Sequence, residues 1–455
     1  MDGRPIRLPK GFLLGTSTAA YQIEGAVAED GRGPSIWDRF VRVPGAVAGG
    51  DTGAVACDHY HRWREDVGWM KRLGFDAYQF SIAWSRVMPG GRGRVEPRGL
   101  DFYGRLVDGL LEAGITPFAT LHHFDLPQAL QDDGGGWLRR EVGRDFQAYV
   151  DVVTRALGDR VKRWATFNEP WELAWQGYHT GEDAPGLRLG VDAALRAGHH
   201  VLLAHGLAVQ AIRANVPGAE AGIVLHLNPV EPATPAAADA EAARRWEGCQ
   251  NRWFLDPLFR GSYPADMLEL FGPLSPGIEP GDPALIGQPL DFLGINLYRR
   301  SVVAAGADLP PVDMRRVNPP GAYSTMGWEV WPRGLHDILL WVHRYCAPPR
   351  IYVTENGFAS DDAVGPDGRC RDPARVEYVR AHLAEALRAR AEGVPLRGYF
   401  VWSTLDNFEW AYGYRRRFGV IHVDFATQRR TVKDSGRLLQ RIAGEPRGEC
   451  PTPTC

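Results

Sequence analysis

Short apolar segments alternate with amphipathic helical stretches along almost the whole chain. Helical patterns occupy, for example, residues 61–74, 100–114 and 375–393, and the last two end in a glycine that stops a helix. Strands that alternate with helices predict βαβ crossovers and hence a parallel sheet. The eight segments with the length and composition of buried strands are FLLGTS (12–17), FDAYQFSI (75–82), ITPFATL (115–121), VKRWATF (161–167), AGIVLHL (221–227), LDFLGINLY (290–298), RIYVTEN (350–356) and LRGYFVW (396–402).

The number of these units favours one α/β architecture. Eight units predict a single (β/α)8 TIM barrel with long βα-loop insertions over residues 1–447, followed by a disordered C-terminal tail at 448–455. A length of 455 residues would otherwise suggest about three domains, but no linker separates modules. A doubly wound open sheet would need a glycine-rich phosphate-binding turn after the first strand, and the sequence has none there.

Charge and composition exclude several classes of function. With 52 basic and 55 acidic residues, the net charge of -3 predicts no nucleic acid or membrane partner. The chain lacks a signal peptide, a long apolar run and metal-site cysteine spacing, so we expect a cytoplasmic protein with no metal and no other cofactor. The 15 tryptophans either fill the core or stack on sugars. A homo-oligomer stays open.

Carboxylates follow two of the predicted strands. Glu169 comes after the fourth strand in ATFNEP, and Glu355 ends the seventh in VTENG. Active sites of such barrels lie at the carboxyl ends of the strands, so the two side chains are expected to face each other across the axis. Paired carboxyl groups are what glycoside hydrolysis requires. Pro170 directly follows Glu169, and we expect it to hold the Glu169 backbone extended.

Longer motifs then make a family recognisable. They cover nearly the whole chain, in order, and resemble the β-glucosidases of glycoside hydrolase family 1, which implies small-molecule β-glycosides or oligosaccharides as partners. These motifs are FLLGTSTAAYQIEGA (12–26), SIWDRF (35–40), ACDHYHRWREDV (56–67), LHHFDLP (121–127), TFNEPW (166–171), NRWFLDP (251–257), TMGWEV (325–330), YVTENG (352–357), WSTLDNFEWAYGYRRRFG (402–419) and TVKDS (431–435).

The resemblance implies a retaining mechanism. Glu169 matches the general acid/base and Glu355 the nucleophile, which predicts a carboxyl separation of about 5 to 5.5 Å. Tyr298 matches the tyrosine that hydrogen-bonds the nucleophile, and Asn168 the residue that binds the sugar 2-hydroxyl.

The resemblance also implies a sugar pocket. Trp402 matches the platform beneath the sugar ring and Trp328 a wall of the aglycone site. Glu409 matches an acceptor of neutral sugar hydroxyls, and because a carboxylate there would repel a phosphate, a free-sugar glycone is expected. The full set of implied substrate-binding residues is Gln22, His123, Asn168, Asn296, Trp328, Trp402, Glu409, Trp410 and Phe418.

Gln79 departs from the family pattern. It stands in YQFSIAWSR where the family has an arginine that pairs with the nucleophile. The absence of that arginine removes a positive charge that would lower the nucleophile's pKa by about one to three units. His122 and Phe124 are milder departures.

We therefore expect an exo-acting retaining β-glucosidase, with β-galactosides and β-fucosides open as further substrates. The alternatives that Gln79 leaves open are a transglycosidase, a specialised glycosidase of secondary-metabolite glycosides, and a noncatalytic sugar binder. Segments 228–246 and 303–324 are expected to form the lips of the pocket entrance.

Overall fold

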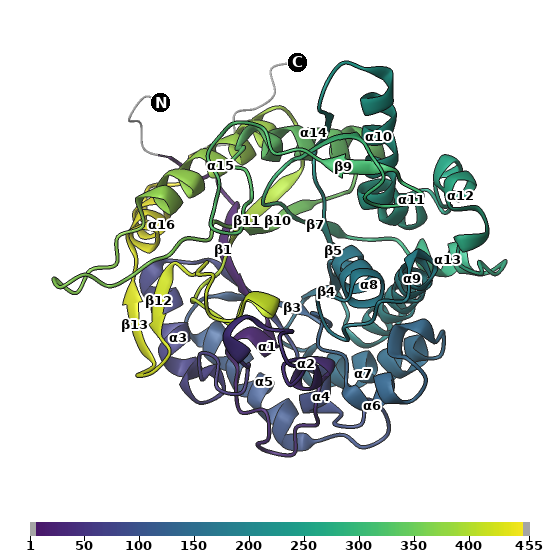
Figure 1. The fold of residues 1–455 in the computed structure, drawn as a ribbon. Helices are drawn as coiled ribbons and strands as arrows, with labels where there is room; N and C mark the ends of the chain where they lie inside the picture. Colours follow the sequence, from purple (N-terminus) through teal and green to yellow (C-terminus); the bar gives the residue numbers. More distant parts are fainter. Residues whose placement is uncertain (1–5, 449–455) are drawn as a thin grey trace.

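All eight predicted strands are present in the computed structural model, which describes residues 6–448, and they close into one parallel barrel (Figure 1). Neighbours in the chain are neighbours in the sheet, and β1 closes the ring by pairing with both β2 and β11. The prediction of a (β/α)8 barrel is confirmed. The barrel strands are β1 (Leu13–Thr18), β2 (Ala77–Ser81), β3 (Thr116–Thr120), β4 (Arg163–Asn168), β5 (Glu220–His226), β7 (Phe292–Asn296), β10 (Ile351–Asn356) and β11 (Leu396–Trp402).

Helices surround the strands because each connection returns the chain to the same end of the sheet (Figure 1). Their apolar faces pack on the barrel and their polar faces meet solvent, as in α5 and α7, where buried residues recur every three or four positions. The surrounding helices are α3 (His59–Leu73), α5 (Pro97–Glu112), α7 (Val142–Leu157), α9 (Val191–Asn215), α11 (Trp253–Phe259), α12 (Ala265–Phe271), α13 (Asp282–Ile286), α14 (Arg333–Cys346), α15 (Pro373–Ala391) and α16 (Asp434–Gly444).

A layer of aromatic side chains fills the barrel interior. Phe118 contacts Phe292, Tyr352 and Phe400 with ring centroids 5.0 to 5.6 Å apart. Gly15 leaves room for this layer, because a Cβ atom there would lie 2.3 Å from the Phe400 ring. The layer closes the barrel beneath the carboxyl ends of the strands, so a cavity can form only above it.

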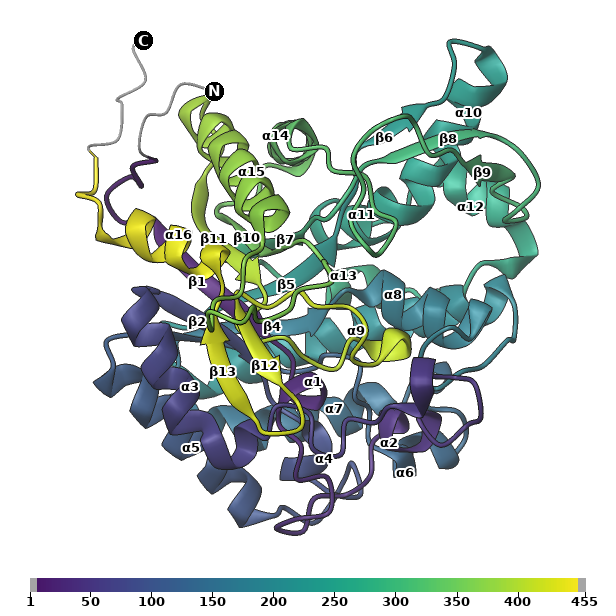
Figure 2. The same cartoon turned by 60° about the vertical axis from the view of Figure 1, so that its left-hand side comes forward.

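Long loops at those carboxyl ends build the walls of the cavity. The fourth loop begins with α8 (Pro170–Ala174), and the loops after β5 and β7 supply α10 (Ala237–Glu247) and a small sheet of β6 (Val230–Pro232), β8 (Ser301–Ala305) and β9 (Met314–Arg316). Figure 2 shows α10 and this sheet standing on one side of the barrel. The remaining short α-helices are α1 (Ala20–Ile23), α2 (Ile36–Phe40), α4 (Trp84–Val87) and α6 (Gln128–Asp132).

The end of the chain returns to the barrel. A hairpin of β12 (Ile421–Asp424) and β13 (Arg429–Val432) lies beside α3, and Gly448 donates its N–H to the carbonyl of Leu8 (Figures 1 and 2). The rest of the expected tail, 449–455, lies outside the described residues. Among residues 6–448, no helix combines the length and apolar character that crossing a bilayer requires. The cytoplasmic location and the oligomeric state stay predictions.

Candidate active site

Glu169 and Glu355 line one cavity of about 1060 Å³ at the carboxyl ends of the strands. Glu169 directly follows β4 and Glu355 lies near the end of β10, where the strand alternation and a register shift against β7 direct it inward. Both side chains are buried, at 7% and 4% exposure. Two largely buried carboxyl groups thus share one cavity.

A sharp turn positions Glu169. Its backbone is left-handed, with φ 47° and ψ 68°, and Pro170 begins α8 directly after it. The prediction of an extended backbone is wrong: proline disfavours only the right-handed helical region, and the left-handed turn lets the Glu169 N–H reach the carbonyl of Val224 on β5 at 2.9 Å. The strained turn is held by the neighbouring strand.

Asn296 is the main hydrogen-bond partner of Glu169. Its Nδ2 donates to Glu169 Oε1 at 2.7 Å and to Asn168 Oδ1 at 3.1 Å, and its own Oδ1 accepts from the Thr354 hydroxyl at 2.7 Å. These residues end three different strands, so the barrel itself fixes the orientation of Glu169. The amide of Asn168 also contacts His123 Nε2 at 3.1 Å.

Glu355 has a single hydrogen-bond donor. The hydroxyl of Tyr298 donates to Glu355 Oε2 at 2.6 Å, and Oε1 has no partner among the described residues. Gln79 is buried on β2, where its amide nitrogen donates to Thr120 Oγ1 at 3.3 Å and its oxygen has no partner among the described residues. No described lysine or arginine lies within 4.0 Å of Glu355, so nothing replaces the missing charge.

Burial shifts the protonation of both carboxyl groups. Burial raises the pKa of Glu169 to about 8, and the nearby Glu172 adds to the rise while His226 and Asn296 oppose it. Burial also raises the pKa of Glu355 well above its usual value, and Glu169 adds to this rise while the Tyr298 hydrogen bond opposes it. Because the two carboxyl groups interact, the pair loses its protons in two separate steps.

Aromatic side chains surround the two carboxyl groups. Trp328 and Phe418 lie beside the Tyr298 ring, with centroids 5.0 and 5.9 Å away. Trp402 and Trp410 lie on two sides of His123, each 5.9 Å from its ring. All five aromatic or imidazole side chains predicted for the sugar pocket line the cavity: His123, Trp328, Trp402, Trp410 and Phe418.

Glu409 also lines the cavity, and Gln22 lies behind it. Gln22 Nε2 is 3.3 Å from Glu409 Oε2 and also donates to the carbonyl of Phe408. Burial raises the pKa of Glu409 to about 8, with Asp183 adding to the rise. Gln22, Asn168 and Asn296 are fully buried and are not among the residues that line the cavity, so the structure places them as supports of side chains that do.

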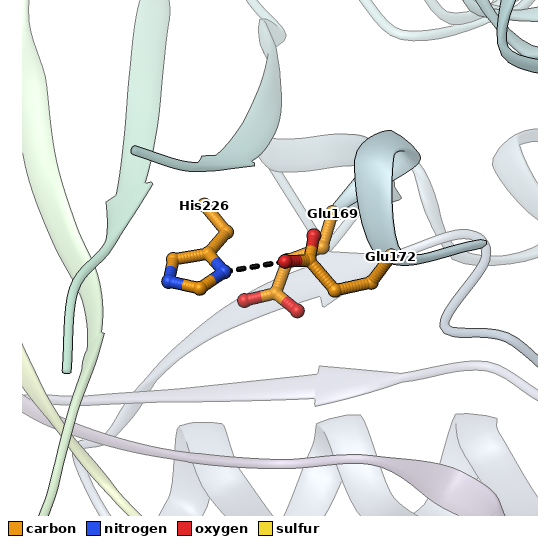
Figure 3. Close-up of side chains that lie close together, drawn as sticks. All are labelled: Glu169, Glu172 and His226. Atoms are coloured by element: carbon orange, nitrogen blue, oxygen red, sulfur yellow. Dashed lines mark hydrogen bonds and ion pairs between the residues drawn. The ribbon is translucent and has the colours of Figure 1, made fainter. Parts of the chain in front are cut away.

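A carboxyl–imidazole pair, which the sequence analysis missed, lies beside Glu169 (Figure 3). Glu172 follows one helical turn later on α8, and its Oε1 is 2.5 Å from Nδ1 of His226 at the end of β5. Within residues 6–448, Glu169, Glu172 and His226 are the one group whose ligand atoms, all within 4.8 Å of one another, could hold a metal ion. An ion bound there would be coordinated by the carboxylate of Glu169. Sequence reasoning could have found His226, because it is a polar residue at the end of a predicted strand.

Comparison with known proteins fits this geometry. The model of glycosyl hydrolase family 1 matches residues 4–447. The chain belongs to that family. The family 1 chain is 47% identical to beta-glucosidase A of Thermotoga maritima, over 96% of its own length and 97% of that protein. It is 44% identical to the bifunctional beta-D-glucosidase/beta-D-fucosidase of Bifidobacterium breve, over 96% and 98%.

Solved structures agree on the fold. The family 1 beta-glucosidase of Thermotoga maritima in complex with isofagomine lactam superposes with a TM-score of 0.94, at 46% identity over 97% of this chain and 99% of that one. The chain is therefore a retaining glycoside hydrolase of family 1, and the alternatives of a transglycosidase or a noncatalytic binder are not favoured.

Proposed function

We propose that this chain hydrolyses β-D-glucosides from the non-reducing end, with β-fucosides or β-galactosides as further substrates, and that Glu355 and Glu169 carry the reaction. The observation that supports this most is the pair of buried carboxyl groups at the ends of β4 and β10, which share one cavity and have no cationic partner within 4.0 Å. The names of the relatives support the sugar: glucosidase in most, and also fucosidase in one.

In the first step Glu355 attacks the anomeric carbon. Its Oε1 has no hydrogen-bond partner, whereas Tyr298 holds Oε2, so Oε1 is the oxygen that forms the new C–O bond. Glu169 gives its proton to the glycosidic oxygen as the bond to the leaving group breaks. The products are a glucosyl ester of Glu355 and a free alcohol.

In the second step the ester is hydrolysed. Glu169, now ionised, takes a proton from water, whose oxygen attacks the anomeric carbon and releases Glu355. The sugar leaves with its original β configuration. This sequence needs one ionised and one protonated carboxyl group in the free enzyme, which is the state that the mutual repulsion of Glu169 and Glu355 favours.

The rest of the pocket selects the sugar. We assign Trp402 and Trp410 to its faces, His123 and Glu409 to its hydroxyls, and Trp328 with Phe418 to the aglycone side. Direct contact of Gln22 and Asn168 with the sugar stays a prediction, since both are buried behind the wall.

The experiment compares aryl β-glucoside, β-galactoside and β-fucoside turnover in wild type, Glu169→Gln and Glu355→Gln. Glu355→Gln is expected to lower kcat/KM by at least about four orders of magnitude, and Glu169→Gln by about 10² to 10⁴. Glu182→Gln, which alters another carboxyl group of the cavity, serves as control and is expected to stay within a few fold. Activity that survives Glu355→Gln would overturn the assignment of the nucleophile.

A further inference from the structure

Three arginines line the same cavity, Arg188, Arg299 and Arg316, and the last two come from the loops after β7. Arg299 directly follows Tyr298 after β7, and Arg316 is the last residue of β9. Arg316 comes from segment 303–324, one of the two predicted to form the entrance, and Trp246 from the other also lines the cavity. The two guanidinium groups therefore belong to the aglycone end of the pocket.

Neither guanidinium has an acidic partner. No carboxylate oxygen of residues 6–448 lies within 4.0 Å of either group. The contrast with the next residue in the chain is direct, because Arg300 has Glu231 at 2.7 Å and Glu329 at 2.9 Å. Arg299 is half-buried, and a half-buried charge is ordinarily paired, so this unpaired arginine, with the unpaired Arg316 lining the same cavity, indicates a place for an anion.

The two guanidinium groups also act on each other. Burial lowers the pKa of Arg299 to about 9, and the charge of Arg316 adds to the decrease, so the group is still protonated at pH 7. Each lies over an indole ring, Arg299 with its Cζ 5.8 Å from the centroid of Trp328 and Arg316 with its Cζ 5.3 Å from that of Trp246. An anion between them would relieve the repulsion.

Acidic groups of the same cavity do not fill this place. Glu172 is bound to His226, and burial raises its pKa to about 8. Burial likewise raises the pKa of Asp183 to about 7. Glu172 acts on both Arg299 and Arg316, and Glu182 acts on Arg316, but all from beyond 4.0 Å. The positive charge of the wall is thus only partly offset.

We propose that Arg299 and Arg316 form an aglycone subsite for a carboxylate, so that the preferred substrates are β-glucosides of acidic aglycones. The proposal rests on the β-glucosidase function proposed above. A planar carboxylate fits the fork of a guanidinium group with two parallel hydrogen bonds, and Trp328 and Trp246 offer flat surfaces beside it. The carboxylate could belong to an aromatic acid or to a uronic acid in the second sugar position.

The test uses matched substrates that differ only in charge. The first pair is 4-(carboxymethyl)phenyl and 4-(carbamoylmethyl)phenyl β-D-glucoside, in which the methylene keeps the two phenols alike as leaving groups. The second pair is β-1,4-glucosyl-glucuronic acid and cellobiose. The quantity measured is the ratio of kcat/KM for the acid to that for its neutral partner, and the pair that shows the preference identifies the source of the carboxylate.

Wild type is expected to prefer the acid in at least one pair, and Arg299→Gln and Arg316→Gln are each expected to lower that ratio about tenfold. Arg315→Gln is the matched control: Arg315 lies on the same strand, but its side chain points to the opposite face, away from the cavity. It removes the same charge and should leave the ratio unchanged. Because Arg316 is exposed, its variant is expected to fold even if Arg299→Gln does not.

Calorimetry also measures how tightly each acid and its neutral partner bind to Glu355→Gln, with and without the arginine substitutions. The ratio of these two affinities is then compared in place of the ratio of kcat/KM. If no glucoside is turned over, the proposed hydrolysis fails, while the binding ratio still reports on the two arginines. A ratio of one or below in wild type for both pairs would overturn the subsite. So would a preference that persists in the Arg299→Gln/Arg316→Gln double variant.

Discussion

Asp406 and Glu409 lie three residues apart on one loop, and both are buried, but their surroundings are opposite. Asp406 accepts from Lys433 at 2.6 Å and from Arg417 at 2.7 Å. Glu409 has no cation within 4.0 Å and accepts from the neutral amide of Gln22. One carboxyl group faces the packing between β11 and the C-terminal hairpin, and the other faces the cavity.

The same contrast holds for the regions to which they belong. Beneath the hairpin, Lys433 also binds Asp362 at 2.5 Å, and Arg375 binds Asp362 and Asp372 at 2.7 and 2.6 Å. Burial raises the pKa of Asp362, but Lys433 and Arg375 outweigh it and leave the pKa below its usual value. In the cavity, burial acts on Glu169, Glu355 and Glu409 without such compensation.

The comparison shows that one barrel uses buried carboxyl groups in two ways. Where a cation is supplied, the carboxylate stays ionised and holds loops together. Where none is supplied, burial raises the pKa of the carboxyl groups, and the repulsion between Glu169 and Glu355 favours the state in which one keeps its proton while the other is ionised, as proton donation and nucleophilic attack require. The predictions below move a charge into or out of each region.

The largest effect is expected from Lys433→Met. This change leaves Asp362 and Asp406 buried with fewer counter-charges, and breaking a buried pair costs about 3–5 kcal/mol. Chemical denaturation measures the loss in the free energy of unfolding. Lys71→Met makes the same change at an exposed position of α3 and should stay within about 0.5 kcal/mol. A loss below about 1 kcal/mol in Lys433→Met would show that the network does not hold the hairpin.

Gln79→Arg restores the arginine that the family pattern pairs with the nucleophile, and it is expected to place a cation beside Glu355. An opposite charge favours the carboxylate, so the pKa of Glu355 falls, and the acidic limb of the pH profile of kcat/KM should move about one to three units lower. The first-step rate at neutral pH should rise for the same reason. Gln79→Met, which adds no charge, is the control, and an arginine variant with its acidic limb unmoved would contradict the electrostatic account of this position.

Tyr298→Phe removes the single hydrogen-bond donor to Glu355. Hydrogen bonds to charged groups contribute about 1.5–3 kcal/mol, so the acidic limb should move upward by about one to two units. The direction is opposite to that of Gln79→Arg. A shift to lower pH in Tyr298→Phe would mean that the hydroxyl does not stabilise the ionised nucleophile.

Glu172→Gln is expected to have the smallest effect. Glu172 raises the pKa of Glu169, so its neutralisation should lower that pKa and move the basic limb of kcat/KM downward, by less than about one unit. Glu182→Gln is the exposed counterpart and should leave the basic limb in place. An upward shift in Glu172→Gln would show that the Glu172–His226 pair acts on Glu169 as a net positive charge.

The sequence predicts the barrel well because each strand carries its own apolar pattern and a strand end defines one face of the fold. Glu169 and Glu355 follow from that rule, and His226 follows from it too. Contacts that depend on which loops meet cannot be predicted in this way. Nothing local in the sequence shows that Gln79 turns its amide to Thr120, or that Arg299 lacks the partner that Arg300 has, since both depend on side chains far away in the chain.

The left-handed backbone of Glu169 illustrates the same limit. The proline rule removes one region of φ and ψ, and local propensity then favours an extended residue. The structure selects the left-handed region because β5 offers the Val224 carbonyl to the Glu169 N–H. Tertiary hydrogen bonding therefore decides the geometry of the proton donor.

The central claim is that Glu355, a buried carboxyl group without a cationic partner, forms a covalent bond to the sugar. Mass spectrometry of the intact protein mixed with 2,4-dinitrophenyl 2-deoxy-2-fluoro-β-D-glucoside tests it. The fluorine slows both formation and breakdown of the ester, whereas the activated leaving group speeds formation alone, so the ester accumulates. The account predicts one added fluoroglucosyl group, located by peptide analysis on Glu355 and absent from Glu355→Gln. An adduct on another residue, or turnover of the parent glucoside with no adduct, would contradict it.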